Sequence, residues 1–123
     1  MRIYIAGPYS PVRAKDKHEA VQVAAKNVHR AIEAGIVLIE KGHHPFVPHL
    51  THYIHVHPSC PRDYGKWWYE YDMTFLELWA EALLYLAPSR GADKELERAK
   101  ELGLRIFYSI DEVPDISNRA PSE

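Results

Sequence analysis

This chain of 123 residues has a single cysteine, no long apolar run and little net charge. Cys60 is the only cysteine, so no internal disulfide bond can form, and a reducing compartment is expected. No run approaches the roughly 18 apolar residues of a membrane span. The formal net charge of -2 lacks the basic footprint of proteins that bind nucleic acids or anionic membranes. We therefore expect a small-molecule partner, with no nucleic acid polymer and no membrane.

The first ten residues, "MRIYIAGPYS", lack features of two further classes. They do not have the charged start and long apolar region of a signal peptide, so we expect a cytoplasmic protein. They contain a single glycine, Gly7, which excludes the dinucleotide-binding fingerprint and the phosphate loop with its lysine.

The remaining composition is that of an ordinary globular protein, with 46% apolar and 26% charged residues. The length suits one domain with a real core. We predict a single domain over residues 1–113 and a loose polar tail over 114–123.

Short apolar runs alternate with helical patterns along the chain. Strands are predicted over 2–7, 45–48, 82–87 and 105–110, and helices over 18–41, 67–80 and 92–102. The first helix is predicted from apolar residues at helical spacing, namely Val21, Ala25, Val28, Ile32, Ile36 and Ile39. Residues 49–66 have no clean period and are predicted to form a loop with a helical turn. The alternation predicts an α/β fold, a Rossmann/flavodoxin-like three-layer sandwich with a mostly parallel sheet of about four strands.

In such a sheet, ligands bind beyond the carboxyl ends of the strands, where the winding reverses. In a doubly wound order this place lies between the first and third strands. The loops expected there are 7–13 and 88–95.

Three carboxylates, Asp93, Glu95 and Glu97, follow the third predicted strand at the start of a helix. Capping and solvation are the ordinary explanation, because acidic residues favour first helical turns. Catalysis by Glu95 is the alternative, since an ionised carboxylate above the sheet suits a nucleophile. The residues just before them suit a phosphate or a sugar hydroxyl: Ser89, Arg90 and Gly91.

Two further candidates lie elsewhere. Asp72 stands among the rings of "WWYEYDMTF". It either caps or pairs with an arginine or histidine, or is desolvated with a raised pKa that suits proton delivery or the fixing of a hydroxyl. Tyr4 of the first strand is either a core residue or part of the site.

Histidines cluster over residues 49–57, close to Cys60. Their spacing would suit a metal face on a helix, but prolines interrupt the segment and no HExxH or CxxC motif is present. His49 follows the second strand and is expected to line the substrate crevice instead.

Four segments resemble the nucleoside 2-deoxyribosyltransferase-like superfamily, in particular a branch of small proteins related to 2′-deoxynucleoside 5′-monophosphate N-glycosidases. They are "IYIAGPYS", "KGHHPFVPHLTH", "WYEYDMTFLE" and "SRGADKELERAKELG", and the resemblance runs over residues 2–108. The late motif of the superfamily is matched in register by Ser89, Gly91, Glu95, Ala99 and Gly103.

The resemblance implies a role for each matching residue. Glu95 would attack the anomeric carbon, Asp72 would support proton transfer and sugar positioning, and Tyr4, in a motif with Gly7, would position the nucleophile. Ser89 would help to hold a 5′-phosphate. Asp93 and Glu97 would then be a helix cap and part of a solvated face.

The match departs from the family in two places. Glu97 replaces a frequent glycine, and Pro8, Tyr9 and Ser10 replace a phosphate loop, which leaves the phosphate requirement open. The expected substrate contacts are Gly7, Tyr9, Ser10, His49, Ser89, Arg90 and Gly91, with no metal and no cofactor.

The expected activity is therefore cleavage or transfer of the N-glycosidic bond of a (deoxy)nucleoside or its 5′-monophosphate, in a homodimer or higher homo-oligomer. Trp67, Trp68, Tyr69 and Tyr71 would serve an interface or the core. Two alternatives remain, a non-catalytic nucleotide-binding module and a metal-dependent enzyme that uses His49 to His57.

Overall fold

The computed structural model describes residues 1–9, 16–55, 57–59 and 65–118. Four strands form one parallel sheet in the order β2-β1-β3-β4. They are β1 (Arg2–Ala6), β2 (His44–Phe46), β3 (Ala82–Tyr85) and β4 (Arg105–Phe107). The α/β class and the parallel sheet predicted from the sequence are confirmed.

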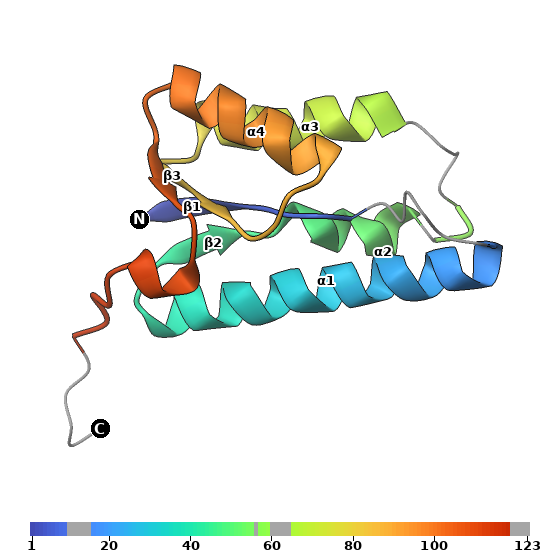
Figure 1. Cartoon of the computed structure of the whole chain (residues 1–123), viewed down its shortest axis with the longest axis horizontal. Coiled ribbons are helices and arrows are strands. Elements are labelled where there is room, and N and C mark those ends of the chain that lie inside the picture. The colour runs from blue at the N-terminus through green and yellow to red at the C-terminus, as the bar shows by residue number, and fades with distance from the viewer. Residues whose placement is uncertain (10–15, 56, 60–64, 119–123) are drawn as a thin grey trace.

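Helices cover both faces of the sheet (Figure 1). The long α1 (Lys17–Glu40) lies on one face, and α3 (Gly65–Leu78) and α4 (Arg90–Glu101) lie on the other. The chain steps from β1 to β2 in one direction and then across β1 to β3 and β4 in the other. Right-handed crossovers therefore place the helices on opposite faces, and the winding reverses between β1 and β3.

The buried face of α1 differs from the expected one. Its N-cap is Asp16, whose Oδ1 accepts the Glu19 N–H at 2.8 Å. The apolar side chains that α1 buries are those of Ala24, Val28, Ala31, Ala34 and Leu38. Of the six apolar positions that predicted the helix, Val28 alone is buried, while Val21 and Ile39 are each 61% exposed. Three alanines let the helix backbone approach the sheet closely, which turns the larger β-branched residues to the side.

Short helical segments replace some of the predicted strand ends. The second strand stops at Phe46, because Pro48 opens the 3₁₀ helix η1 (Pro48–Thr51), which runs into α2 (His52–His55). The fourth strand stops at Phe107 and is followed by the 3₁₀ helix η2 (Ile110–Glu112). Within the described ranges, none of the helices has both the length and the apolar character needed to cross a membrane.

Alternating residues of β1 divide the core into two clusters. Ile3 and Ile5 face α1, whereas Tyr4 and Ala6 face α3 and α4. All four are completely buried, because β1 is a central strand covered on both sides.

The chain after β4 packs against the C-terminal end of α1. The Lys41 ammonium donates to the carbonyl oxygens of Ile110, at 2.8 Å, and Val113, at 2.9 Å. His43 Nε2 donates to the carbonyl oxygen of Pro114 at 2.7 Å. These contacts lie at the end of the molecule opposite the carboxyl ends of the strands.

Candidate active site

Tyr4 and Glu95 form a buried hydrogen-bonded pair. The Tyr4 hydroxyl donates to Glu95 Oε2, although the two residues are 91 positions apart in the chain. Tyr4 is completely buried, and Glu95 is only 8% exposed. Burial raises the pKa of the Tyr4 hydroxyl well above its usual value, and the nearby Glu95 and Asp72 carboxyls raise it further. Tyr4 therefore stays protonated and acts as a donor to the carboxyl group.

The position of Glu95 follows from where α4 begins. Ser89 is the N-cap, since its hydroxyl oxygen accepts the Ala92 N–H at 3.0 Å. The helix therefore starts at Arg90, earlier than the sequence pattern predicts, and Glu95 lies in the second turn on the face packed against the sheet. Ser89 takes the capping role expected of Asp93, whose Oδ1 instead accepts a hydrogen bond from the Tyr85 hydroxyl at 2.6 Å.

Burial affects the pKa of Glu95 more than its place near the amino-terminal end of a helix does. Loss of hydration raises the pKa of its carboxyl to about 8, the hydrogen bond from Tyr4 lowers it, and the Asp72 charge raises it. The ionised carboxylate expected from a place in the first helical turn is therefore not the resting form at neutral pH.

Asp72 supplies a second carboxyl from α3. Among the described residues, its Oδ1 atom has neither solvent contact nor a hydrogen-bond partner. Burial raises the pKa of this carboxyl to about 7. The charge of Asp72 also raises the pKa of Glu95, so the two carboxyls interact across the site.

A cavity of about 350 Å³ brings these groups together with most of the predicted contacts. Seven predicted residues line it besides Glu95, namely Gly7, Tyr9, His49, Asp72, Ser89, Arg90 and Gly91. Tyr4 lies beneath Glu95 as its hydrogen-bond partner. Ser10, the remaining predicted contact, is outside the described residues.

The sequence did not assign Trp68 or Tyr69 to this cavity, although both line it. They were considered only for an interface or a core, because a run of aromatic residues does not say which face of a helix meets a cavity. In the structure, Trp67 is exposed and the two following rings turn toward the site. Lys94 Nζ lies 5.7 Å from the centre of the Tyr69 ring.

His49 holds the loop that follows β1. Its Nε2 donates to the carbonyl oxygens of Gly7, at 3.0 Å, and Pro8, at 3.1 Å. Because both partners are acceptors, Nε2 carries the proton, and burial lowers the pKa of the imidazole. The other ring nitrogen, Nδ1, is buried without a hydrogen-bond partner in the described part of the chain. His49 is therefore a neutral support for one wall of the cavity.

Tyr9 is held from two sides. Its hydroxyl lies 2.7 Å from His52 Nδ1, and its carbonyl oxygen accepts a hydrogen bond from the Asn27 side chain. These contacts tie the first loop to α1 and α2.

The histidine segment makes contacts within the chain. His49 and His52 are engaged as described, and His57 Nδ1 accepts the Ser59 N–H at 3.0 Å. Where the structure describes the chain, no three side chains of the metal-binding types are gathered into one site.

Comparison with known proteins adds no relative, since neither a family model nor a curated protein matches the chain. A proposal for the function therefore has to rest on the geometry of the site. A carboxyl held by a tyrosine, a second carboxyl with a raised pKa, and a partly aromatic cavity are together suited to nucleophilic attack and proton delivery.

Proposed function

We propose that the protein breaks or transfers the N-glycosidic bond of a (deoxy)nucleoside or its 5′-monophosphate, with Glu95 as the nucleophile. The observation that carries this proposal is the buried Tyr4–Glu95 pair, which shares one cavity with Asp72 at the reversal of the sheet winding. Ligands of parallel α/β sheets bind at this place.

The first step forms a covalent bond between the sugar and the protein. Tyr4 holds Oε2 of Glu95, which leaves Oε1 to attack the anomeric carbon. The bond from this carbon to the base nitrogen breaks, and its electron pair goes to the base. Asp72, directly or through a water molecule, supplies the proton that the departing base takes up.

The second step releases the sugar. A water molecule gives a hydrolase, and a second base gives a transferase, since either attacks the anomeric carbon, gives its proton to the Asp72 carboxylate and frees the Glu95 carboxylate. Neither step requires a metal or an organic cofactor. The pKa of about 8 for Glu95 lies above that of about 7 for Asp72, so the proton rests on Glu95, and the reaction requires it to pass to Asp72 as the substrate binds and Glu95 ionises.

The walls of the cavity suit the rest of such a substrate. Trp68 and Tyr69 offer rings to a base. Ser89 and Arg90 offer a hydroxyl and a guanidinium to a sugar or a phosphate. A Cβ atom at Gly91 would meet no atom within 4 Å, so there is open room beside it for a phosphate.

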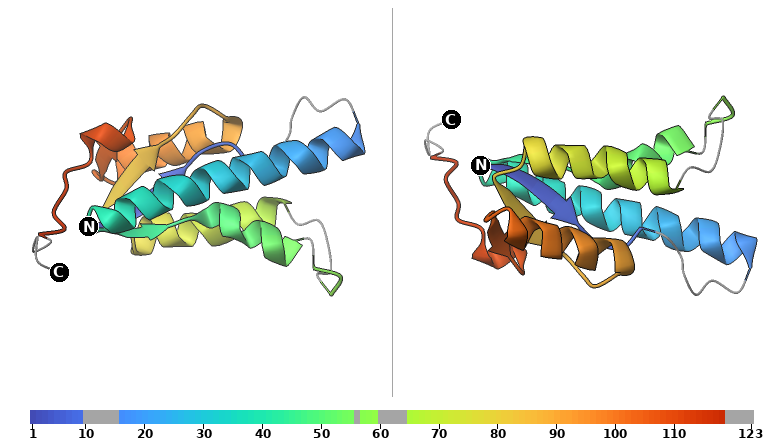
Figure 2. Two further views of the ribbon diagram at one scale, coloured as in Figure 1. Left: turned by 90° about the horizontal axis from the view of Figure 1, so that it is seen from below. Right: turned by 90° about the horizontal axis from the view of Figure 1, so that it is seen from above.

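We further propose that two copies of the chain associate through an apolar groove beside β2. The groove is lined by α1, β2, η1, α2 and α3, and none of the described residues that line it is charged. Its exposed apolar side chains include Ile36, Ile39, Leu50 and Ile54. Figure 2 shows α2 on the same side of the molecule as α3, away from α4.

The decisive experiment measures free base released from a panel of nucleosides and their 5′-monophosphates. Wild type is compared with Glu95→Gln and with Glu97→Gln, which changes an exposed glutamate on the same helix. We expect Glu95→Gln to lower the rate by about a thousandfold or more and Glu97→Gln to retain it. Activity on monophosphates alone would establish the phosphate requirement.

Two other results would contradict the proposed catalysis, and the first of them would favour a non-catalytic nucleotide-binding module. If wild type releases no base even with an acceptor base present, while nucleotides raise its melting temperature, the protein binds without catalysis. Equal loss of activity in both variants would also remove the special role of Glu95.

A further inference from the structure

The Tyr4 hydroxyl can hold Glu95 in one place only if the Tyr4 ring is itself held, and the neighbouring strand provides that support. In the register of β1 and β2, Tyr4 lies opposite Phe46, so both side chains lie on the same face of the sheet. The centres of the two rings are 5.7 Å apart, and their planes are tilted by 32°. Among the described residues, Phe46 is the one aromatic residue whose ring packs on that of Tyr4.

Phe46 is fixed in turn by two rings of α3 and the turn after it. Phe75 stacks on Phe46 with ring centres 4.3 Å apart and planes within 13° of parallel. Trp79 packs against the same ring at 61°, with centres 6.1 Å apart. Contacts from two directions leave the Phe46 ring few orientations. Phe75 lies three residues after Asp72 on α3, so one face of this helix supplies both the second carboxyl and the support of Tyr4.

Phe46 lies outside the cavity that holds the reacting groups. The described residues that line the Glu95 cavity do not include Phe46, which lines the apolar groove beside β2 instead. Phe46 therefore has no place for contact with a substrate in that cavity. Its contact with the site runs through the ring of Tyr4, whose hydroxyl donates to Glu95 Oε2.

The hydrogen bond from Tyr4 depends on this support. Hydrogen bonds weaken steeply when the donor and acceptor move out of alignment, so a Tyr4 ring that is free to shift holds Glu95 less well. The bond favours the ionised carboxyl and lowers the pKa of Glu95. It also holds Oε2, which in the proposed reaction leaves Oε1 aimed at the anomeric carbon.

We infer that Phe46 is a positioning residue, which packs on the Tyr4 ring and thereby fixes the hydroxyl that orients Glu95. The positioning follows from the ring contacts, whereas its effect on turnover rests on the proposed function.

The test follows the Glu95 carboxyl by NMR titration of protein labelled with ¹³C-glutamate, in which Glu95→Gln identifies the signal. Phe46→Leu keeps the position apolar but removes the planar ring. We expect it to raise the pKa of Glu95 by about 0.5 or more, because the Tyr4 hydrogen bond weakens. The kcat of base release should fall by about tenfold or more with KM unchanged, since Phe46 does not line the cavity.

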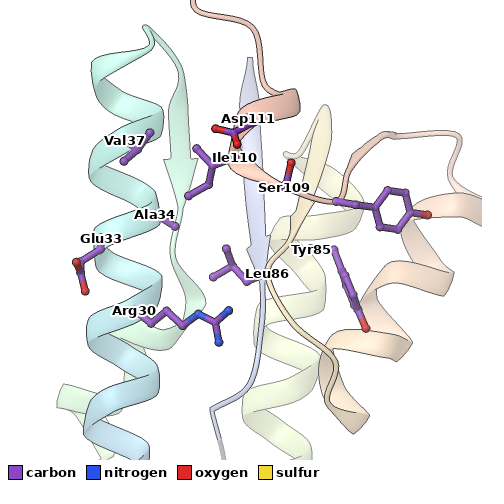
Figure 3. Close-up of a pocket in the computed structure, with 10 residues that line it drawn as sticks. Arg30, Glu33, Ala34, Val37, Tyr85, Leu86, Ser109, Ile110 and Asp111 are labelled. Atoms are coloured by element: carbon purple, nitrogen blue, oxygen red, sulfur yellow. The ribbon is translucent and has the colours of Figure 1, made fainter.

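The opposite face of the sheet provides a matched control. Phe107 of β4 is buried in the core cluster on the α1 face, across the sheet from Tyr4. Figure 3 shows that face, where Ala34 and Leu86 of the same cluster line a cavity between α1 and η2. Phe107→Leu makes the same chemical change and should lower stability, but it should leave the Glu95 titration and kcat unchanged.

A double substitution shows whether Phe46 acts through Tyr4. Tyr4→Phe removes the hydroxyl and should raise the pKa of Glu95 by itself. In that background, Phe46→Leu should change neither the titration nor kcat further, because the hydrogen bond is already absent. An effect that Phe46 exerted through association at the groove would persist in the double variant.

Three results would overturn the inference. They are a Glu95 titration that Phe46→Leu leaves unchanged, equal changes in Phe46→Leu and Phe107→Leu, and an undiminished effect of Phe46→Leu in the Tyr4→Phe background. Phe46→Met allows the same comparisons if the leucine variant does not fold. If wild type releases no base while the titration shifts as expected, the proposed function fails and the positioning role of Phe46 remains.

Discussion

Glu95 illustrates how one side chain is governed by its surroundings more than by its place in a helix. Its second-turn position faces the sheet, where the loss of hydration raises the carboxyl pKa and the Tyr4 hydroxyl only partly offsets that rise. A substrate whose anomeric carbon develops positive charge favours the ionised form at the moment when it must react. Under the proposed function, substrate binding would therefore ionise Glu95.

The raised pKa of Glu95 predicts a pH-dependent effect of Glu95→Gln on stability. The pKa rises from 4.5 to about 8 on folding, so the folded state holds the proton more tightly. The stability that this proton provides is fully present below pH 4.5 and is lost as the pH rises toward 8. Glutamine carries no titrating proton and still accepts the Tyr4 hydrogen bond. We therefore expect it to stabilise the protein at pH 8.5 by about 2 kcal/mol or more, relative to its effect at pH 5.

Thermal or urea unfolding at the two pH values measures this difference. Glu97→Gln serves as the control, because Glu97 is exposed on the same helix and should show little dependence on pH. A Glu95→Gln effect that is the same at pH 5 and pH 8.5 would contradict a raised pKa for this carboxyl.

At the residue scale, the sequence was informative where a residue type was unusual in its place. An aspartate among aromatic rings and a glutamate after a buried strand both line the cavity. The hydrogen bonds from His49 to the carbonyls of Gly7 and Pro8 were not predictable, because they depend on how a loop folds back over another segment. The aromatic residues of α3 were ambiguous for the same reason.

At the scale of elements, α4 depends on its N-cap. Ser89 has an extended backbone, with φ −162° and ψ 166°, and its hydroxyl satisfies the Ala92 N–H. We expect Ser89→Ala to lower the free energy of unfolding by about 1 kcal/mol, since that amide loses its partner. Ser89→Asp should restore most of it, because a carboxylate also caps and interacts well with the helix dipole.

Ser109 provides a matched control for the cap. It precedes η2 with a similar backbone, φ −154° and ψ 157°, but its side chain makes no capping hydrogen bond. Urea unfolding of Ser109→Ala should therefore show a much smaller loss of stability. Equal losses at both positions would mean that serine acts through the backbone and not through the cap.

The type of each element was predictable from the sequence, but the face that a helix buries was less predictable. Helical spacing over 18–41 located α1 correctly, yet two apolar sets lie on that helix and the sequence does not say which one meets the sheet. Packing decides in favour of the alanines, because they allow the closest approach to Ile3 and Ile5. The boundary of β2 was missed by a short distance, since Pro48 is equally suited to a strand edge and to the first position of a helix.

At the scale of the whole molecule, the strand order determines where chemistry can occur. Reversal of the winding between β1 and β3 leaves the loops after both strands free to meet above the sheet, and the Glu95 cavity lies there. On the two faces of the sheet, α1 lies opposite α3 and α4 (Figure 1).

The apolar groove beside β2 supplies the last prediction, self-association of the chain. Ile36, which is 49% exposed, lines the groove, whereas Val21 on the same helix is 61% exposed and lies outside it. We expect wild type to sediment at twice the chain mass of 14.2 kDa and Ile36→Glu to sediment as a monomer, because burying an unpaired carboxylate in an interface is costly. Val21→Glu adds the same charge to α1 and should remain a dimer. Specific association is expected in the micromolar range or below. Wild type that stays monomeric at about 100 μM would therefore contradict self-association through the groove. Dissociation by both substitutions would instead place the interface along the whole exposed side of α1.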